Sequence, residues 1–128
     1  MAESSFRYGS GGNQLYVFNA PIITGYGRYS YSRLNPEEAR ELVRLCPDFV
    51  SAVGHEATAL FASELLGVKV PVNRVNAQMV AGDKAIVFKL RGRLPEGIVL
   101  RTLAELYEYS EGREPFELGL LVREAEAR

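Results

Sequence analysis

Residues 48–67, DFVSAVGHEATALFASELLG, decide the class of fold that the sequence predicts. The first six residues are typical of a brief strand, and Gly54 separates them from a segment whose apolar side chains recur at helical spacing. These side chains belong to Leu60, Phe61, Leu65 and Leu66. Gly67 is the kind of residue with which helices commonly end. A strand that passes directly into a helix is a building unit of folds that interleave strands and helices.

The rest of the chain continues this interleaving. Short runs of β-forming residues predict strands at residues 15–22, 28–32, 85–90 and 115–124. The tyrosines of the second run could stack on bases, but their alternation with polar residues favours cross-strand packing. Capping boxes predict two further helices, from Asn35 with Glu38 and from Thr102 with Glu105. We therefore expect an α/β fold of the mixed α+β type, with a mixed β-sheet flanked by helices.

Length and composition indicate a single compact domain. The chain has 128 residues and 47% hydrophobic content, which suits one core. We interpret residues 1–13 as a flexible glycine-rich lead, residues 14–124 as the domain, and residues 125–128 as a C-terminal tail. Apolar runs stay well short of the roughly 20 residues of a membrane span. Because the N-terminus also lacks the apolar stretch of a secretory signal, we expect a cytoplasmic location and no membrane partner.

The charge balance and the cysteine count exclude several classes of protein. Lys and Arg number 15 against 16 Asp and Glu, whereas proteins that coat long DNA or RNA usually carry a basic excess. A small anionic ligand held by a few arginines remains compatible with this balance. The single cysteine, Cys46, excludes an intrachain disulfide and a cysteine-based metal cluster. We interpret Cys46 as an inert, buried side chain.

His55, the only histidine, lies at the start of the helix predicted in the opening segment. Free backbone N–H groups and the helix dipole attract anions at such a position, and Gly54 would let a ligand approach the backbone. An imidazole can also give or take a proton near neutral pH. A solvent-facing or capping histidine is the plain alternative. Asn19, after the first strand, and Arg74 are further candidates for ligand contacts.

A second candidate site follows the strand at residues 85–90. The segment RGRLPEG, residues 91–97, carries Arg93 and Glu96 three residues apart. Arginine binds phosphate with two parallel hydrogen bonds, and a carboxylate could orient a hydroxyl nucleophile or hold the arginine. An ordinary salt-bridged turn explains the same residues without a ligand.

Metal and cofactor chemistry has no recognisable pattern in this sequence. One histidine, one cysteine and scattered carboxylates lack the ligand spacing of zinc or two-metal sites. A Walker loop and a nucleophile elbow are absent. We therefore expect no metal and no cofactor. Metal-free RNA cleavage remains, in which the 2′-hydroxyl attacks the adjacent phosphate and the enzyme protonates the leaving oxygen. A symmetric dimer could place one His55 at each of two equivalent bonds.

Three ordered blocks give the sequence a family resemblance. They are GHEAT at residues 54–58, NRV at residues 73–75 and RLPEG at residues 93–97. In this order and spacing they resemble the viral anti-CRISPR ring nucleases directed against type III systems and the cellular ring nuclease 2 group. The resemblance extends from about residue 15 to residue 123.

The resemblance implies a compact mixed α/β homodimer that binds cyclic tetra-adenylate across its two-fold axis. Members of the family cleave this second messenger without metal to linear di-adenylate, which switches off the ancillary CRISPR effectors. Carried over by motif, His55 is the general acid for the departing 5′-oxygen. Arg93 neutralises the scissile phosphate, and Glu96 positions the 2′-hydroxyl or its arginine partner.

The same blocks imply the contacts that bind the ligand. Arg74 of the NRV block and Asn19 near the end of the first strand are expected to touch the cyclic nucleotide. Gly54 of the GHEAT block and Gly97 of the RLPEG block are expected to lie against the cyclic nucleotide. Ile22 stands where archaeal-virus members carry a serine, so no contact is predicted there.

Two other classes of function are compatible with these residues. One is a binding module, a sponge or sensor that holds the cyclic nucleotide without cleaving it. The other is a small interaction protein with no nucleotide ligand. The presence of His55 together with Arg93 and Glu96 favours cleavage, because binding alone needs no proton donor.

Overall fold

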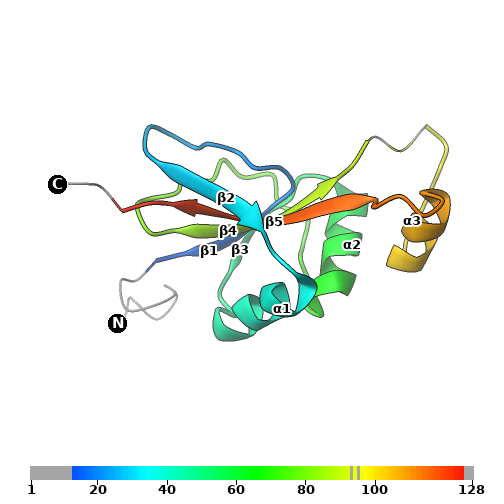
Figure 1. The fold of residues 1–128 in the computed structure, drawn as a ribbon, viewed down its shortest axis with the longest axis horizontal. Coiled ribbons are helices and arrows are strands. Elements are labelled where there is room, and N and C mark those ends of the chain that lie inside the picture. The colour runs from blue at the N-terminus through cyan, green and yellow to red at the C-terminus, as the bar shows by residue number, and fades with distance from the viewer. Residues whose placement is uncertain (1–12, 93, 95, 126–128) are drawn as a thin grey trace.

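Five strands form one mixed β-sheet in the computed structural model, which describes residues 13–125 apart from Arg93 and Pro95 (Figure 1). The strands are β1 (Leu15–Phe18), β2 (Tyr29–Arg33), β3 (Val50–Ala52), β4 (Lys84–Leu90) and β5 (Phe116–Arg123). Their order across the sheet is β2-β5-β4-β1-β3. β1 pairs in parallel with β3 and β4, whereas β5 is antiparallel to β4 and β2. The mixed sheet predicted from the sequence is confirmed.

The helices begin where their capping residues predict. They are α1 (Pro36–Leu45), α2 (Glu56–Leu66) and α3 (Leu103–Tyr109). Both capping boxes are present, at the starts of α1 and α3. Gly67 ends α2 in the left-handed conformation, with a φ of 75° that suits glycine. In the part of the chain that the structure describes, none of the helices is long and apolar enough to cross a membrane.

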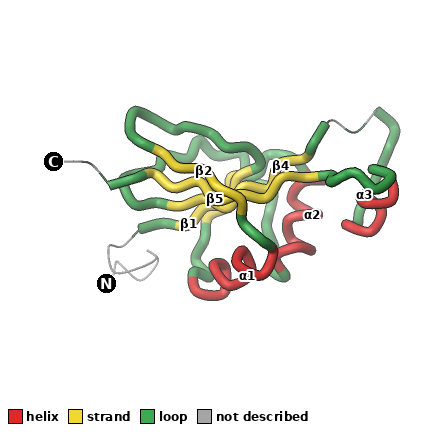
Figure 2. Tube along the Cα trace, in the orientation of Figure 1, coloured by secondary structure: helices red, strands yellow, loops and turns green. Residues whose placement is uncertain are grey.

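Helices α1 and α2 cover one face of the sheet. Figure 1 shows α1 and α2 together on one side, with α3 beyond the end of β4, and Figure 2 repeats this arrangement by type of structure. Side chains from this sheet face and from the helices form the larger core, including Val17, Ile86, Phe88, Val43, Phe61 and Leu65. Cys46 is buried in the same core, as predicted. Leu60, which recurs with Phe61, Leu65 and Leu66 at helical spacing, is exposed on α2 and lies outside this core.

A smaller core lies on the opposite face of the sheet. Phe18, Val87 and Leu121 project there and are covered in part by Met79. Met79 belongs to the non-helical segment that connects α2 with β4. Cross-strand packing of the tyrosines is also found here, because the ring of Tyr31 lies against Gly119 of β5. The sheet is therefore packed on both faces. A ligand-binding site is expected in the described loops at the ends of the strands.

Candidate functional site

The parallel strands β1, β3 and β4 all end at the same edge of the sheet. Asn19 follows β1 directly, and Gly54 and His55 follow β3 after one intervening residue. Ligands of open α/β sheets commonly bind outside the carboxyl ends of the strands. The fold therefore brings residues from two separate sequence segments to the kind of edge where a ligand is expected.

A third segment, residues 72–74, is hydrogen-bonded alongside the end of β3. Val72 forms an isolated parallel bridge with Val53, and the N–H of Asn73 donates to the Val53 carbonyl at 2.8 Å. The Asn73 side-chain amide also donates to the carbonyl of Ser51 at 2.7 Å. These contacts hold the backbone before Arg74 against the end of β3. The position of Arg74 is thus set by hydrogen bonds between residues about 20 positions apart.

Arg74 lies across Gly54. Its Nε donates to the Gly54 carbonyl at 2.9 Å, and a Cβ placed on Gly54 would lie 3.3 Å from Cγ of Arg74. Glycine therefore leaves room for the arginine to lie close to the backbone. Within the described chain, the two Nη groups of Arg74 form no hydrogen bond or ion pair. Their donors remain available to an anion.

His55 is the N-cap residue of α2, with an extended backbone (φ −125°, ψ 132°). Its side chain is exposed and makes no capping bond, and among the described residues it has no hydrogen-bond partner. The first bond of the helix runs from the N–H of Ala59 to the His55 carbonyl, at 3.0 Å. The preceding N–H groups of Glu56 and Ala57 have no acceptor in the described structure. An imidazole and free backbone donors thus occupy one helix start.

His55 and Arg74 line one shallow pocket of about 510 Å³ beside this helix start. Its lining includes Asn19, Gly54, His55, Arg74, Val75 and Asn76. None of the lining residues is acidic. The helix N-terminus carries a partial positive charge, and Arg74 adds a full one, so the pocket favours an anionic ligand.

The structure thus brings together four of the seven predicted site residues, namely Asn19, Gly54, His55 and Arg74. Arg93 lies outside the described residues. Glu96 and Gly97 are exposed in a turn after β4 and do not line this pocket. The resemblance implies a pocket across the two-fold axis of a dimer, so the approach of these two residues to it stays a prediction.

The register of the sheet explains why Glu96 and Gly97 lie apart. Val87 of β4 pairs with Phe18, the last residue of β1. β4 then continues for three more residues to Leu90, with β5 as its partner. At the usual rise of a strand, this extension moves the following turn about 10 Å beyond the end of β1.

Three residues of the pocket were missed by the sequence reading, Ala52, Val75 and Asn76. Asn76 stands two positions after Arg74, and this alternate spacing was the available signal. Lys89 is a further exposed cation near the carboxyl end of β4. Among the described residues, no group of three or more His, Cys, Asp and Glu side chains could hold a metal ion.

Comparison with known proteins places the chain in a family. The family model described as STIV B116-like matches residues 15–114, which include all of the lining residues of the pocket. The chain belongs to the STIV B116-like family. The matched range begins at the first residue of β1 and continues past α3.

The relatives of this STIV B116-like protein include viral and bacterial chains. It is 43% identical over 96 residues to "uncharacterized protein ORF117" of Acidianus two-tailed virus, covering 72% of this chain and 82% of the relative. "Uncharacterized protein 26" of Sulfolobus islandicus filamentous virus is 38% identical, with coverage of 72% and 80%. "Uncharacterized protein YddF" of Bacillus subtilis is 28% identical, with coverage of 68% and 82%.

A solved structure supports the fold. B116 of Sulfolobus turreted icosahedral virus superimposes with a TM-score of 0.68, over 87% of this chain and 100% of that one. The two sequences are 24% identical, so this similarity concerns the fold alone.

Proposed function

We propose that the protein is a ring nuclease, a metal-independent phosphodiesterase that binds cyclic tetra-adenylate between two copies of the chain and cleaves it to linear di-adenylate. The observation that carries the proposal is the pocket in which His55 and Arg74 meet at the N-terminus of α2. The resemblance of the GHEAT, NRV and RLPEG blocks supplies the identity of the ligand. Through this activity the protein would shut off type III CRISPR signalling.

The first requirement of such an enzyme is a place for a phosphate. The free Nη groups of Arg74 and the unused N–H groups at the start of α2 supply donors, and none of the pocket's lining side chains repels an anion. Arginine and helix N-termini are common phosphate ligands because their donors and charge match the anion. The geometry therefore suits one phosphate of the ring in each pocket.

The second requirement is a proton donor for the leaving group. In the proposed step the 2′-oxygen forms a bond to phosphorus, and the bond from phosphorus to the 5′-oxygen breaks. Protonated His55 gives its proton to the departing 5′-oxygen, while the 2′-hydroxyl proton passes to a base or to solvent. The cut end then carries a 2′,3′-cyclic phosphate. The exposure of His55 supports this role, because the imidazole forms no hydrogen bond with a described residue and can contact a ligand.

Two copies of the chain are part of the proposal. Each chain has one histidine and one such pocket among its described residues, whereas formation of two di-adenylates requires two cuts in the ring. A two-fold axis would supply a second His55 and a second Arg74 to equivalent bonds. The resemblance assigns the roles of Arg93 and Glu96. In the proposed dimer, the turn after β4 of one chain could approach the pocket of its own chain or that of its partner.

The test is single-turnover cleavage of cyclic tetra-adenylate in excess EDTA, with wild type beside His55→Ala and His55→Gln. Wild type should convert the ring to di-adenylate, whereas both variants should be slowed about 100-fold or more and retain the ring. An intact ring that still co-elutes with wild type would contradict cleavage and identify a sponge or sensor. A ring that neither binds nor reacts would point to an interaction protein without this ligand.

A further inference from the structure

The first residues of β5 have a free edge, because β2 ends before it reaches them. β2 ends at Arg33, which pairs with Gly119, whereas β5 begins three residues earlier, at Phe116. On the other side, β4 covers this part of β5, with Leu90 paired to Phe116. A notch of about 370 Å³ lies along the free edge, lined mainly by residues 31–36, Tyr107 and residues 116–119.

The backbone of Phe116 is directed toward this notch. Alternate residues of an antiparallel strand direct both backbone groups to the same neighbouring strand. The N–H of Arg91 donates to the Pro115 carbonyl at 2.8 Å, so Pro115 faces β4. The N–H of Leu34 donates to the Leu118 carbonyl at 3.1 Å, so Leu118 faces β2. Phe116, two residues before Leu118, therefore also faces the side of β2.

The path of the chain after β2 leaves Phe116 without a strand partner. If the register of Arg33 with Gly119 continued, Phe116 would face Pro36, but Pro36 begins α1 and has no N–H. Among the described residues, the N–H and the carbonyl of Phe116 have no hydrogen-bond partner. Phe116 is buried, and buried backbone groups are normally paired. The notch therefore favours a ligand that supplies both an acceptor and a donor.

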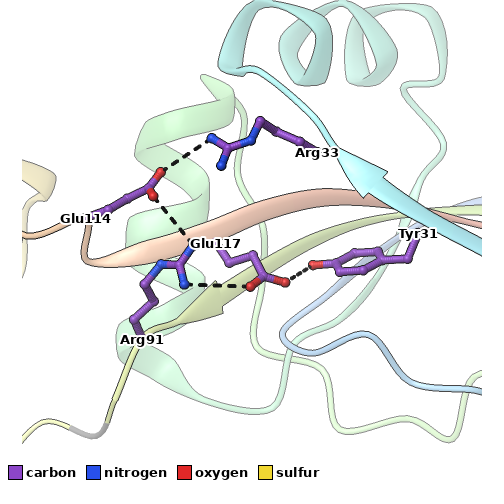
Figure 3. Close-up of polar contacts among 5 residues, drawn as sticks. All are labelled: Tyr31, Arg33, Arg91, Glu114 and Glu117. Atoms are coloured by element: carbon purple, nitrogen blue, oxygen red, sulfur yellow. Dashed lines mark hydrogen bonds and ion pairs between the residues drawn. The ribbon is translucent and has the colours of Figure 1, made fainter.

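One side of the notch carries charged groups, among which Arg33 has unused donors (Figure 3). The hydroxyl of Tyr31 donates to one oxygen of Glu117 at 2.5 Å, and the other oxygen lies 3.9 Å from Arg91. Figure 3 shows Arg33 pointing from β2 toward Glu114, with the ion-paired atoms 3.9 Å apart. Within the described chain, Arg33 forms no hydrogen bond. Its guanidinium can therefore bind an incoming carboxylate.

The other side of the notch is apolar. The side chains of Leu34, Phe116 and Leu118 belong to the larger core. Tyr107 of α3 lies edge-on to Phe116, with ring centroids 5.9 Å apart, and its side chain remains about half exposed. Successive side chains of a strand point to opposite faces. A strand in the notch would thus place one side chain against Tyr107 and the next on the side of Arg33.

We propose that the notch is a docking site at which an extended segment of a partner protein adds a short strand to β5. The segment runs in the direction of β2 and exchanges two main-chain hydrogen bonds with Phe116. An apolar side chain of the segment packs beside Tyr107, and a neighbouring acidic side chain binds Arg33. The notch shares no lining residue with the pocket of His55 and Arg74, so this proposal does not depend on ring cleavage.

A protective role for Arg33 makes the opposite prediction. Charged side chains at a sheet edge commonly prevent pairing with another chain. If Arg33 only guards the edge of β5, its removal should strengthen the binding of a peptide strand. If it binds a carboxylate of the partner, its removal should weaken that binding. The sign of the change in affinity therefore separates the two roles.

The decisive measurement is an NMR titration of the full-length, isotope-labelled protein with the peptide acetyl-Thr-Glu-Val-Glu-Thr-amide. The amide signal of Phe116 should shift in a saturable manner, because its N–H gains an acceptor. N-methylation of the valine removes the donor for the Phe116 carbonyl and keeps every side chain, so it should weaken binding about tenfold or more. Exchange of both glutamates for lysine should weaken binding to a similar degree.

Arg33→Gln should weaken binding of the first peptide about tenfold, the scale of one hydrogen bond to a charged group. The matched control is Arg44→Gln, because Arg44 is also an exposed, ion-paired arginine but lies at the far end of α1. Its affinity for the peptide should equal that of wild type. Tighter binding by Arg33→Gln would overturn the proposal in favour of an edge guard.

Three further results would also overturn the proposal. One is the absence of a Phe116 shift up to about 10 mM peptide, which would nearly saturate even a millimolar complex. Another is a Phe116 amide whose hydrogen exchange slows as the protein concentration rises, which would identify a second copy as the occupant. The last is a Phe116 shift caused by cyclic tetra-adenylate, which would assign the notch to the nucleotide. Failure of wild type to cleave the ring would contradict the proposed function alone.

Discussion

Gly54 and Arg74 bring two backbone segments into contact in the candidate pocket. A Cβ on Gly54 would lie 3.3 Å from Cγ of Arg74, closer than an ordinary van der Waals contact. We predict that Gly54→Ala displaces the arginine and weakens the binding of cyclic tetra-adenylate about tenfold, the scale of one hydrogen bond to a charged group. Equilibrium binding by isothermal titration calorimetry measures this change.

Gly25→Ala is the matched control for this substitution. A Cβ on Gly25 meets nothing within 4 Å, and its φ is not in the left-handed region. The affinity of the Gly25→Ala variant for the ring should equal that of wild type. If Gly54→Ala also binds like wild type, the contact between Gly54 and Arg74 has no part in holding the ligand.

The single cysteine makes a separate prediction about a residue that the site does not use. Cys46 is 6% exposed, and burial raises the pKa of its thiol, an effect that Lys84 opposes only in part. Because the thiolate is the reactive form, we predict labelling by a thiol reagent at least about tenfold slower in the folded protein than in urea. Comparable labelling rates in the two states would show that Cys46 is accessible.

At the scale of whole elements, the capping boxes were the most reliable part of the sequence prediction. Asn35 with Glu38 and Thr102 with Glu105 act over three residues, so the starts of α1 and α3 follow from local chemistry. The placement of Arg74 did not follow, because it depends on the bridge between Val53 and Val72. A local sequence pattern does not predict contacts between residues that are distant in the sequence.

The position of the second candidate segment shows the same limit. The spacing of Arg93 and Glu96 was visible in the sequence, and so was the strand that precedes them. The distance from that strand to the pocket was not, because it is set by the pairing of Val87 with Phe18 and by the three residues of β4 that continue past it. Register is a property of two strands and cannot be read from one of them.

The start of α3 also predicts a dependence of stability on pH. The Glu105 carboxylate accepts from the backbone N–H of Arg101 at 2.7 Å and of Thr102 at 3.2 Å, and these bonds lower its pKa in the folded protein. A lowered folded-state pKa contributes stability that is present above the ordinary glutamate pKa. This stability is lost as the pH falls through the lowered value.

We therefore predict that Glu105→Gln destabilises the protein most at neutral pH and that its difference from wild type shrinks in acid. Urea unfolding followed by circular dichroism over a pH series measures the difference. Glu111→Gln, an exposed glutamate at the other end of α3 with no resolved bond to a backbone N–H, is the control. A difference between Glu105→Gln and wild type that stays constant down to low pH would contradict the assignment.

At the scale of the whole molecule, the local charge of the site and the total charge of the chain have opposite signs. The chain has a formal net charge of −1, whereas the pocket is lined by His55 and Arg74 with no acidic residue. Such an arrangement suits a compact anion rather than a long nucleic acid, which usually binds a chain with a basic excess. A ring of four phosphates, bound over a two-fold axis, would contact both pockets of a dimer at once.

The proposed two-fold symmetry leads to a prediction about products. In a dimer of two wild-type chains, each His55 should protonate the leaving oxygen of one bond, and two cuts release two di-adenylates. A mixed dimer of one wild-type chain and one His55→Ala chain, isolated through two different affinity tags, has a single proton donor. Under single-turnover conditions it should open the ring once and accumulate linear tetra-adenylate, because the second bond lies beside the chain that lacks the imidazole.

Chromatography of the early products distinguishes the possible arrangements. If the two sites act independently, the first product of the mixed dimer should be linear tetra-adenylate. The initial rate of ring opening should then be about half that of wild type. Direct release of di-adenylate by the mixed dimer would mean that one His55 serves both bonds. A mixed dimer as slow as the doubly substituted protein would mean that each cut needs both imidazoles, and either result would contradict the assignment of one histidine to one bond.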